Sequence, residues 1–370
     1  MAEMGENVPA YRMIKVTGPQ GPVEAVVDVE AWRARASYPD ILGLGGPVFG
    51  VCREHEAGGW ELLDAFSGLA PQESRDDMGA VLRLRGKEVR AAGDVAGHDE
   101  CLRAADRLEW ERLDELTVLG TRYRVVRAER FIRTGPDGPE PPRPSDPDPA
   151  GPGEHYRADW DENGYIIDPA QPTAAAEGAL KIELLSLICT ADAVPPDVRQ
   201  DSVRAATTHP GGVLLPATFM TAERTGGRWV PDSAGVETTP QQARDGLAMG
   251  LRVMIPWRLG LTEEEREPYL RAADRLDETR ADELDVLGRR FRVVRVERLV
   301  RVGPDGPEGP RPSDRDPYPP VGLLGEPESE AAASQPIELD EDTQRLSDML
   351  DTERARDRTR RGNRTKRRKR

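Results

Sequence analysis

The sequence predicts an α+β protein of two tandem ferredoxin-like units, each of βαββαβ type with one extra helix, and a disordered basic C-terminal tail. Residues 101–149 and 269–317 align without a gap over 49 positions, and 35 of these are identical. In both halves the hydrophobic pattern changes between strand and helix periods in the same order. The tail is predicted from charge, because basic residues dominate 354–370.

Each half is expected to begin with a strand, a helix and a hairpin. A short apolar run predicts the strand, and apolar residues at helical spacing predict the helix. A Gly-Gly pair between two extended segments predicts the hairpin. In the two halves these elements are strands at 11–16 and 180–185, helices at 23–36 and 197–207, and hairpins around 58–59 and 226–227.

Two helices are expected to follow the hairpin. Proline suits the first helical turn, because its missing N–H would have no partner there, so one helix should begin at Pro71 and at Pro240. The apolar residues of 98–119 share one helical face, and Gly120 is expected to end that helix. In the second half Thr262, with Glu three residues later, predicts a capping box at the matching start.

The last strand of the first half, 122–133, is the strongest candidate for ligand contact. It carries five arginines, and all five recur in the second half. Guanidinium groups suit phosphate and carboxylate, so the strand could bind anions. The alternative is structural, because acidic residues recur with the arginines and could neutralise them in ion pairs. The residues proposed for anion contact are Arg124, Arg127, Arg292 and Arg295.

Proline content and the repeat divide the chain into five parts. Repeat units are expected at 1–134 and 175–302, and each is followed by a proline-rich segment, 135–174 or 303–336. Such segments are typical of extended, semi-rigid linkers. The remaining residues, 337–370, are first acidic and then basic, and we expect them to be mostly disordered.

The end of the chain is expected to bind polyanions. The net charge is −15, yet residues 354–370 contain eleven Arg or Lys and one Asp. Such a segment binds phosphate backbones without sequence preference, through counterion release. Contact with an acidic protein, or with the acidic remainder of this chain, stays open. The acidic stretch 337–354 could dock on a partner as a short helix. The tail residues proposed for polyanion contact are Arg367, Arg368, Lys369 and Arg370.

Catalytic, metal and cofactor motifs are not found in the sequence. The three cysteines lack CxxC spacing, and no two of the four histidines have metal-ligand spacing. The glycine-rich segments 43–46 and 58–59 do not match nucleotide-binding loops. We therefore expect no metal and no cofactor. The odd cysteine count, with no signal segment and no long apolar run, predicts a cytoplasmic protein without a membrane span.

Several sequence motifs recur or stand out: GPVFGV at 46–51, GGW at 58–60, PQ..RD at 71–76 and 240–245, and VLG.R.RVVR.ER..R.GPDGPE.PRPSD in both halves. With these motifs the chain resembles an uncharacterised family of actinomycete proteins, classed as a domain of unknown function. The resemblance covers most of residues 10–320. It implies a cytoplasmic actinomycete protein, and it implies no activity, substrate or catalytic residue.

These features favour a cytoplasmic, non-enzymatic interaction or scaffold protein. Two duplicated units would form a pseudo-dimer within one chain, and the basic tail would bind an unknown protein or polyanion, including nucleic acid without sequence preference. The alternative is a small-ligand-binding protein or enzyme with a pocket between the sheets of the two units. No pair of catalytic residues supports the enzyme. The second half has the better helix caps, so we expect it to be the more stable half.

Overall fold

The computed structural model describes residues 9–154, 156, 164–189, 194–231, 235–324 and 340–368. The fold is α+β, as predicted, and its strands pair in antiparallel fashion. Packing divides the chain into two compact units, each assembled from three separate segments. The described residues of unit 1 fall within Met1–Thr134, Asp159–Ala217 and Glu297–Gly325, and those of unit 2 within Gly135–Ala158, Thr218–Val296 and Glu326–Arg370.

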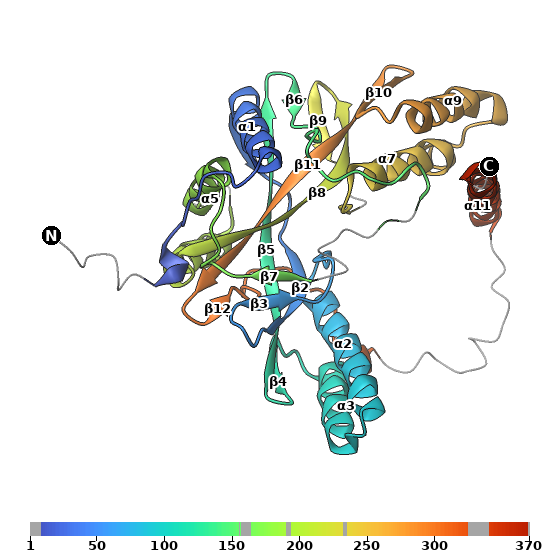
Figure 1. The fold of residues 1–370 in the computed structure, drawn as a ribbon. Helices are drawn as coiled ribbons and strands as arrows, with labels where there is room; N and C mark the ends of the chain where they lie inside the picture. The colour runs from blue at the N-terminus through green and yellow to red at the C-terminus, as the bar shows by residue number, and fades with distance from the viewer. Residues whose placement is uncertain are drawn as a thin grey trace. The chain divides into compact units, whose positions relative to one another are not determined.

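Unit 1 is built around the long strand β5 (Thr121–Gly135), which was predicted over 122–133 (Figure 1). On one side β5 pairs with β2 (Val48–Glu54), and the sheet continues through β3 (Trp60–Leu62) to β7 (Tyr165–Ile167). On the other side β5 pairs with the second half of β11 (Arg289–Gly303). The β2–β3 hairpin was predicted, whereas β7 lies in a segment expected to be a linker.

The edge of β5 next to β2 is also paired with a short strand that the sequence did not predict. β1 (Asp40–Gly43) pairs with the end of β5, and β2 pairs with its middle. The four residues between β1 and β2 leave the ladder as a loop, 44–47, which begins where the Leu44 N–H donates to a β5 carbonyl at 2.9 Å. We call 44–47 the glycine-rich loop.

Helices α2 (Pro71–Ala91) and α3 (Val95–Trp110) lie side by side and cover β2 and β5 (Figure 1). α2 begins at Pro71, as predicted, and the proline occupies its first turn. The predicted first helices are also present, as α1 (Pro22–Ser37) and α6 (Pro196–Thr208). The buried core between the α2–α3 pair and the sheet includes Phe49, Val51, Met78, Leu82, Leu108 and Val125.

Two predicted strands are wrong, and with them the ferredoxin-like order. Tyr11 lies in a short 3-10 helix, η1 (Ala10–Arg12), and residues 180–185 lie in α5 (Ala175–Ser186). A short apolar run cannot be told from a buried helix by its pattern alone. Here Leu180 and Leu184 are buried on one helical face. Without a first strand, neither half has the βαββαβ order in its described residues.

The helix predicted over 98–119 ends at Trp110, earlier than expected. Residues Glu115–Val118 form β4, which makes a hairpin with β5. Leu119 and Gly120 have φ values of 52° and 76° and form the tip of this hairpin. Two consecutive residues with positive φ are typical of a type I′ turn. Gly120 therefore permits a hairpin turn and does not cap a helix.

Unit 2 contains the first half of β11, joined by a hairpin to β10 (Glu283–Val286). The strand order continues from β11 through β8 (Gly211–Thr225) to β9 (Arg228–Pro231), and the predicted Gly-Gly turn joins β8 to β9. Helices α7 (Pro240–Met249) and α9 (Glu263–Thr279) share a buried core with β10 and β11. The predicted start at Pro240 and the predicted capping box of Thr262 and Glu265 are both confirmed.

In the C-terminal segment, where the sequence predicted disorder, residues 341–368 form a helix. α11 (Glu341–Arg368) belongs to unit 2, and its Met349 is buried. Glu353, also buried, pairs with Arg252 at 3.1 Å, and Arg252 is itself only 4% exposed. The acidic stretch 337–354 thus contains the amphipathic helix considered for it, and that helix docks on this chain.

The β10–β11 turn contains a strained leucine. Leu287 and Gly288 have φ values of 49° and 78°, and Leu287 is 66% exposed. Leucine is disfavoured at positive φ, whereas Asn is favoured at the first position of a type I′ turn. We expect Leu287→Asn to raise the free energy of unfolding by about 1 kcal/mol, measured by urea denaturation. The control Leu259→Asn changes an exposed leucine at φ −87° and should give no gain; equal gains would contradict the strain argument.

Candidate functional site

The arginines of β5 and β11 are paired with acidic residues of two proline-rich tracts. The tract 305–316 contacts β5 in unit 1, and the tract 137–148 contacts β11 in unit 2. Each arginine strand is therefore covered by the tract from the other half of the sequence. We call these two segments the exchanged tracts.

In unit 1 the contacts involve two arginines proposed from the sequence. Arg124 pairs through Nη2 with the carboxylates of Glu115 and Asp305, each at 2.5 Å. Arg127 pairs through Nε with Asp314 at 3.0 Å. Both arginines are only 8% exposed. Their charges are thus neutralised inside the unit, which matches the structural alternative raised for them.

Unit 2 repeats these contacts at the aligned positions. Arg292 pairs with Glu283 and donates to the carbonyl of Pro139 at 2.8 Å. Arg295 pairs through Nε with Asp146 at 3.1 Å. All four arginines proposed for anion contact therefore have carboxylate partners within their own units.

A tryptophan holds each exchanged tract at its glycine. In unit 1 the Arg124 guanidinium lies 4.7 Å from the Trp60 ring centre, a cation–π contact. Gly306, at φ 104°, lies against the same ring, and a Cβ there would overlap it. Trp229 and Gly138 make the same contact in unit 2. Each tryptophan therefore packs between an arginine of the strand and a glycine of the exchanged tract, which is a structural role.

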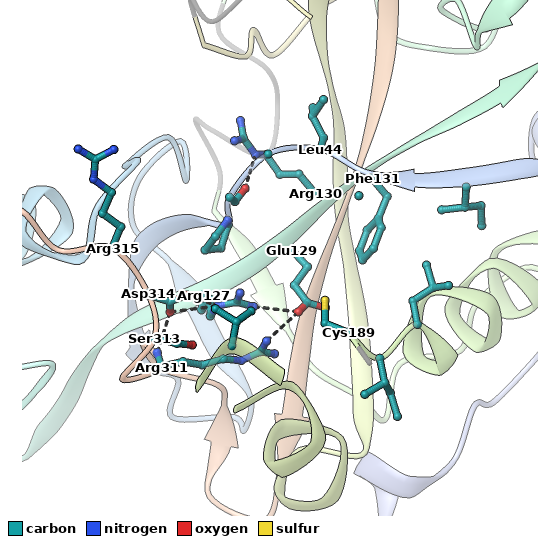
Figure 2. Close-up of a pocket in the computed structure, with 18 of the residues that line it drawn as sticks. Leu44, Arg127, Glu129, Arg130, Phe131, Cys189, Arg311, Ser313, Asp314 and Arg315 are labelled. Atoms are coloured by element: carbon teal, nitrogen blue, oxygen red, sulfur yellow. Dashed lines mark hydrogen bonds and ion pairs between the residues drawn. The ribbon is translucent and has the colours of Figure 1, made fainter. Parts of the chain in front are cut away.

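A pocket of about 600 Å³ lies in unit 1 beside this network (Figure 2). Its lining combines apolar side chains with charged ones, and all of it comes from unit 1. The lining residues are Ile41, Gly43, Leu44, Gly45, Gly46, Pro47, Arg127, Glu129, Arg130, Phe131, Ser186, Leu187, Ile188, Cys189, Val198, Arg311, Ser313, Asp314 and Arg315.

The charged part of the lining is a network centred on Glu129. Its carboxylate forms ion pairs with Arg127 and Arg311, each at 3.0 Å (Figure 2). Arg301, which does not line the pocket, lies 3.6 Å from the same carboxylate. Burial raises the pKa of Glu129, but the three guanidinium charges more than offset it and hold the pKa below its usual value. Arg127 also bridges to Asp314, so both pocket carboxylates are ionic partners of arginine.

Arg130 differs from Arg127 and Arg311, the two lining arginines that pair with Glu129. Its Nε donates to the Gly46 carbonyl of the glycine-rich loop at 3.1 Å (Figure 2). No carboxylate among the described residues forms an ion pair with it. Arg130 is partly buried, and burial lowers its pKa. A guanidinium that is partly desolvated and has no counter-ion favours binding of an anion, because the anion would offset the cost of desolvating the charge.

The aligned residue of the second half, Arg298, has a different environment. It lies directly opposite Arg130 in the β5–β11 ladder. Arg298 is fully buried, and it donates to the carbonyls of Pro216 at 3.0 Å and Ala65 at 3.1 Å. Burial lowers its pKa to about 10. The repeat therefore places an arginine at both positions, but only Arg130 lines the pocket.

An insertion in the first half forms the glycine-rich loop. Seven residues separate Pro39 from Pro47, whereas five separate Pro210 from Pro216 in the second half. β8 runs unbroken through the shorter stretch, whereas the longer one is divided into β1 and β2. This length difference is the signal in the sequence that could have located the pocket.

The other proposed residues lie at the C-terminus. Arg367 and Arg368 are in α11, but their side chains are outside the described residues, and so are Lys369 and Arg370 as a whole. Polyanion contact by these four residues stays a prediction. Within the described ranges, no group of three His, Cys, Asp or Glu side chains is placed to hold a metal ion. In the same ranges no helix has the length and apolar content needed to cross a membrane.

The sequence matches a family of unknown function, DUF5954, over residues 21–317. The chain belongs to this family. No curated protein and no solved structure matches it. The DUF5954 match spans every residue that lines the pocket and both exchanged tracts, whereas α11 lies outside it. The pocket is therefore part of the DUF5954 region of the chain.

Proposed function

We propose that this DUF5954 protein binds a small molecule, and that the pocket of unit 1 is the binding site. The observation that carries the proposal is a pocket of about 600 Å³ whose apolar wall is partly open to water. Leu187 and Ile188 in this wall are 40% and 37% exposed. A ligand with an apolar body would remove this surface from water, which favours binding.

The contacts in the pocket support binding over catalysis. A nucleophilic mechanism needs a nucleophile within hydrogen-bond reach of a base. The Ser186 hydroxyl donates to the Glu183 carbonyl at 2.6 Å, and the described lining contains no histidine. Glu129 and Asp314 are engaged with arginines. We also propose a cytoplasmic location, because all three cysteines are free thiols, which suits a reducing compartment.

We infer further that the chain arose by tandem duplication. The aligned residues Arg130 and Arg298 face each other across the β5–β11 ladder. Such pairing of equivalent residues is typical of a two-fold interface between identical subunits. The exchanged tracts support the same origin, because reciprocal exchange of an element is a common route to dimers.

The binding proposal is tested by native mass spectrometry on full-length protein purified gently at low salt. We expect a small-molecule adduct on the wild-type protein and its loss from Cys189→Trp, because the indole would fill the pocket beside the exposed Cys189. The control Val230→Trp adds the same indole at an exposed position in unit 2 and should keep the adduct. An adduct that survives Cys189→Trp, or no adduct on any variant, would contradict the proposal.

A further inference from the structure

We propose that the ligand of the unit 1 pocket carries an oxyanion, a carboxylate or phosphate group, and that Arg130 binds it. This inference rests on the proposed function, because it names the chemical class of the ligand for the same pocket. It assigns a role to an arginine that the sequence did not distinguish from its neighbours on β5.

The charge of the lining supports an anionic ligand. Among the described residues that line the pocket, four are arginines and two, Glu129 and Asp314, are carboxylates. Two of these arginines, Arg127 and Arg311, pair with Glu129. The surplus is positive, although the whole chain has a net charge of −15. A positively charged pocket in an acidic protein attracts anions locally, and its partly apolar walls strengthen that attraction.

The hydrogen bonds of Arg130 leave donors for a ligand. A guanidinium has five N–H donors, and Arg130 uses Nε for the Gly46 carbonyl. The planar pair of nitrogens at the end of the side chain matches the two oxygens of a carboxylate or phosphate. Arg298 shows the contrast, because backbone carbonyls of Ala65 and Pro216 bind its guanidinium.

The glycine-rich loop keeps Arg130 uncovered. Gly45 has φ 57°, a conformation that side chains other than glycine rarely adopt. A Cβ at Gly45 would lie 3.6 Å from Arg130 Nη2, in contact with the guanidinium. The absence of a side chain at this position therefore leaves room beside the donor that the ligand needs.

The apolar lining defines the rest of the ligand. Phe131 and Leu44 are buried in the pocket wall, and Ile188 is exposed at it. An alkyl or aryl body would pack against these side chains while the oxyanion reaches Arg130. The ligand class is thus a small amphipathic anion, such as an acyl or aryl carboxylate or an alkyl phosphate.

The test compares four probes that each contain eight carbons: octanoate, octyl phosphate, octanol and octylamine. Binding to the full-length protein is measured by titration calorimetry. We expect octanoate or octyl phosphate to bind at least about tenfold more tightly than octanol, and octylamine to bind most weakly. A tighter octyl phosphate identifies the phosphate class, and a tighter octanoate identifies the carboxylate class.

Arg130→Met tests the role of the residue. The preference for the anion over octanol should disappear, while octanol binding stays within about twofold, because the methionine keeps an apolar stem. Arg33→Met, at an exposed position of α1 in the same unit, should keep the preference. Arg130→Lys should retain part of it, since the charge remains without the planar fork.

The possible failures are distinguishable. If neither octanoate nor octyl phosphate binds the wild-type protein more tightly than octanol does, the anion inference is overturned and the binding pocket stays in place. A preference that survives Arg130→Met would overturn the role of Arg130. If none of the four probes binds, both the inference and the proposed site are overturned.

Discussion

Expressed separately, residues 1–150 and residues 175–325 are both expected to be largely unfolded as monomers. Unit 1 needs Glu297–Gly325, and unit 2 needs Gly135–Ala158, so each fragment carries a segment that the other requires. In fragment 1–150, Arg124 and Arg127 would lose Asp305 and Asp314. Breaking one buried ion pair costs about 3–5 kcal/mol, and a whole domain is stable by only about 5–15 kcal/mol.

The fragments are compared by circular dichroism and by thermal melts with size measurement. Neither should melt cooperatively alone, whereas co-expression of residues 1–150 with residues 151–370, which restores β7 and α11, should give a folded complex. A folded, monomeric 1–150 fragment would contradict the exchange of tracts. This expectation replaces the one drawn from helix caps. The helix caps at Thr239 and Thr262 are present. However, a cap contributes only about 1 kcal/mol to the free energy of unfolding, which is less than the cost of breaking the ion pairs that an exchanged tract makes.

Asp314→Asn is expected to lower the free energy of unfolding by about 3 kcal/mol. The Asp314 and Arg127 side chains are 5% and 9% exposed. The amide keeps the size of the side chain but removes its charge, which leaves Arg127 with Glu129 alone. Glu129 already forms ion pairs with two further arginines, Arg301 and Arg311. Urea denaturation of the full-length protein measures the change.

The control is Glu111→Gln, which breaks an ion pair on the surface. Arg107 and Glu111 pair at 2.9 Å with side chains 52% and 46% exposed. Exposed pairs contribute little, so this change should stay within about 0.5 kcal/mol. If Asp314→Asn cost no more than the control, ion pairs would not be what holds tract 305–316 on β5.

Local signals in the sequence predicted local structure well. Proline at the first turn located the starts of α2 and α7, and the Gly-Gly pairs located both hairpins. Apolar runs without such signals failed, because α5 buries Leu180 and Leu184 in a segment short enough to be a strand. The turn at Leu119 was missed because leucine is rare at positive φ.

The exchange of tracts could not be predicted from the sequence. Asp146 and Asp314 both stand in the same PRPSD words, so Arg127 has two partners with identical local chemistry. Only the three-dimensional path of the chain selects Asp314. The pocket was missed for a similar reason. Five arginines recur in both halves, and the sequence does not show that Arg130 lines a pocket while Arg298 is fully buried.

The exchanged tracts also affect how the protein can be synthesised. Domains commonly fold in order from the N-terminus while the ribosome is still translating the chain. Unit 1 holds the N-terminal segment, yet its sheet includes the second half of β11, and its arginines pair with Asp305 and Asp314. Its completion must therefore wait until most of the 370 residues have been translated. Until then, the unpaired edge of β5 and its arginines are exposed to chaperones and to other nascent chains.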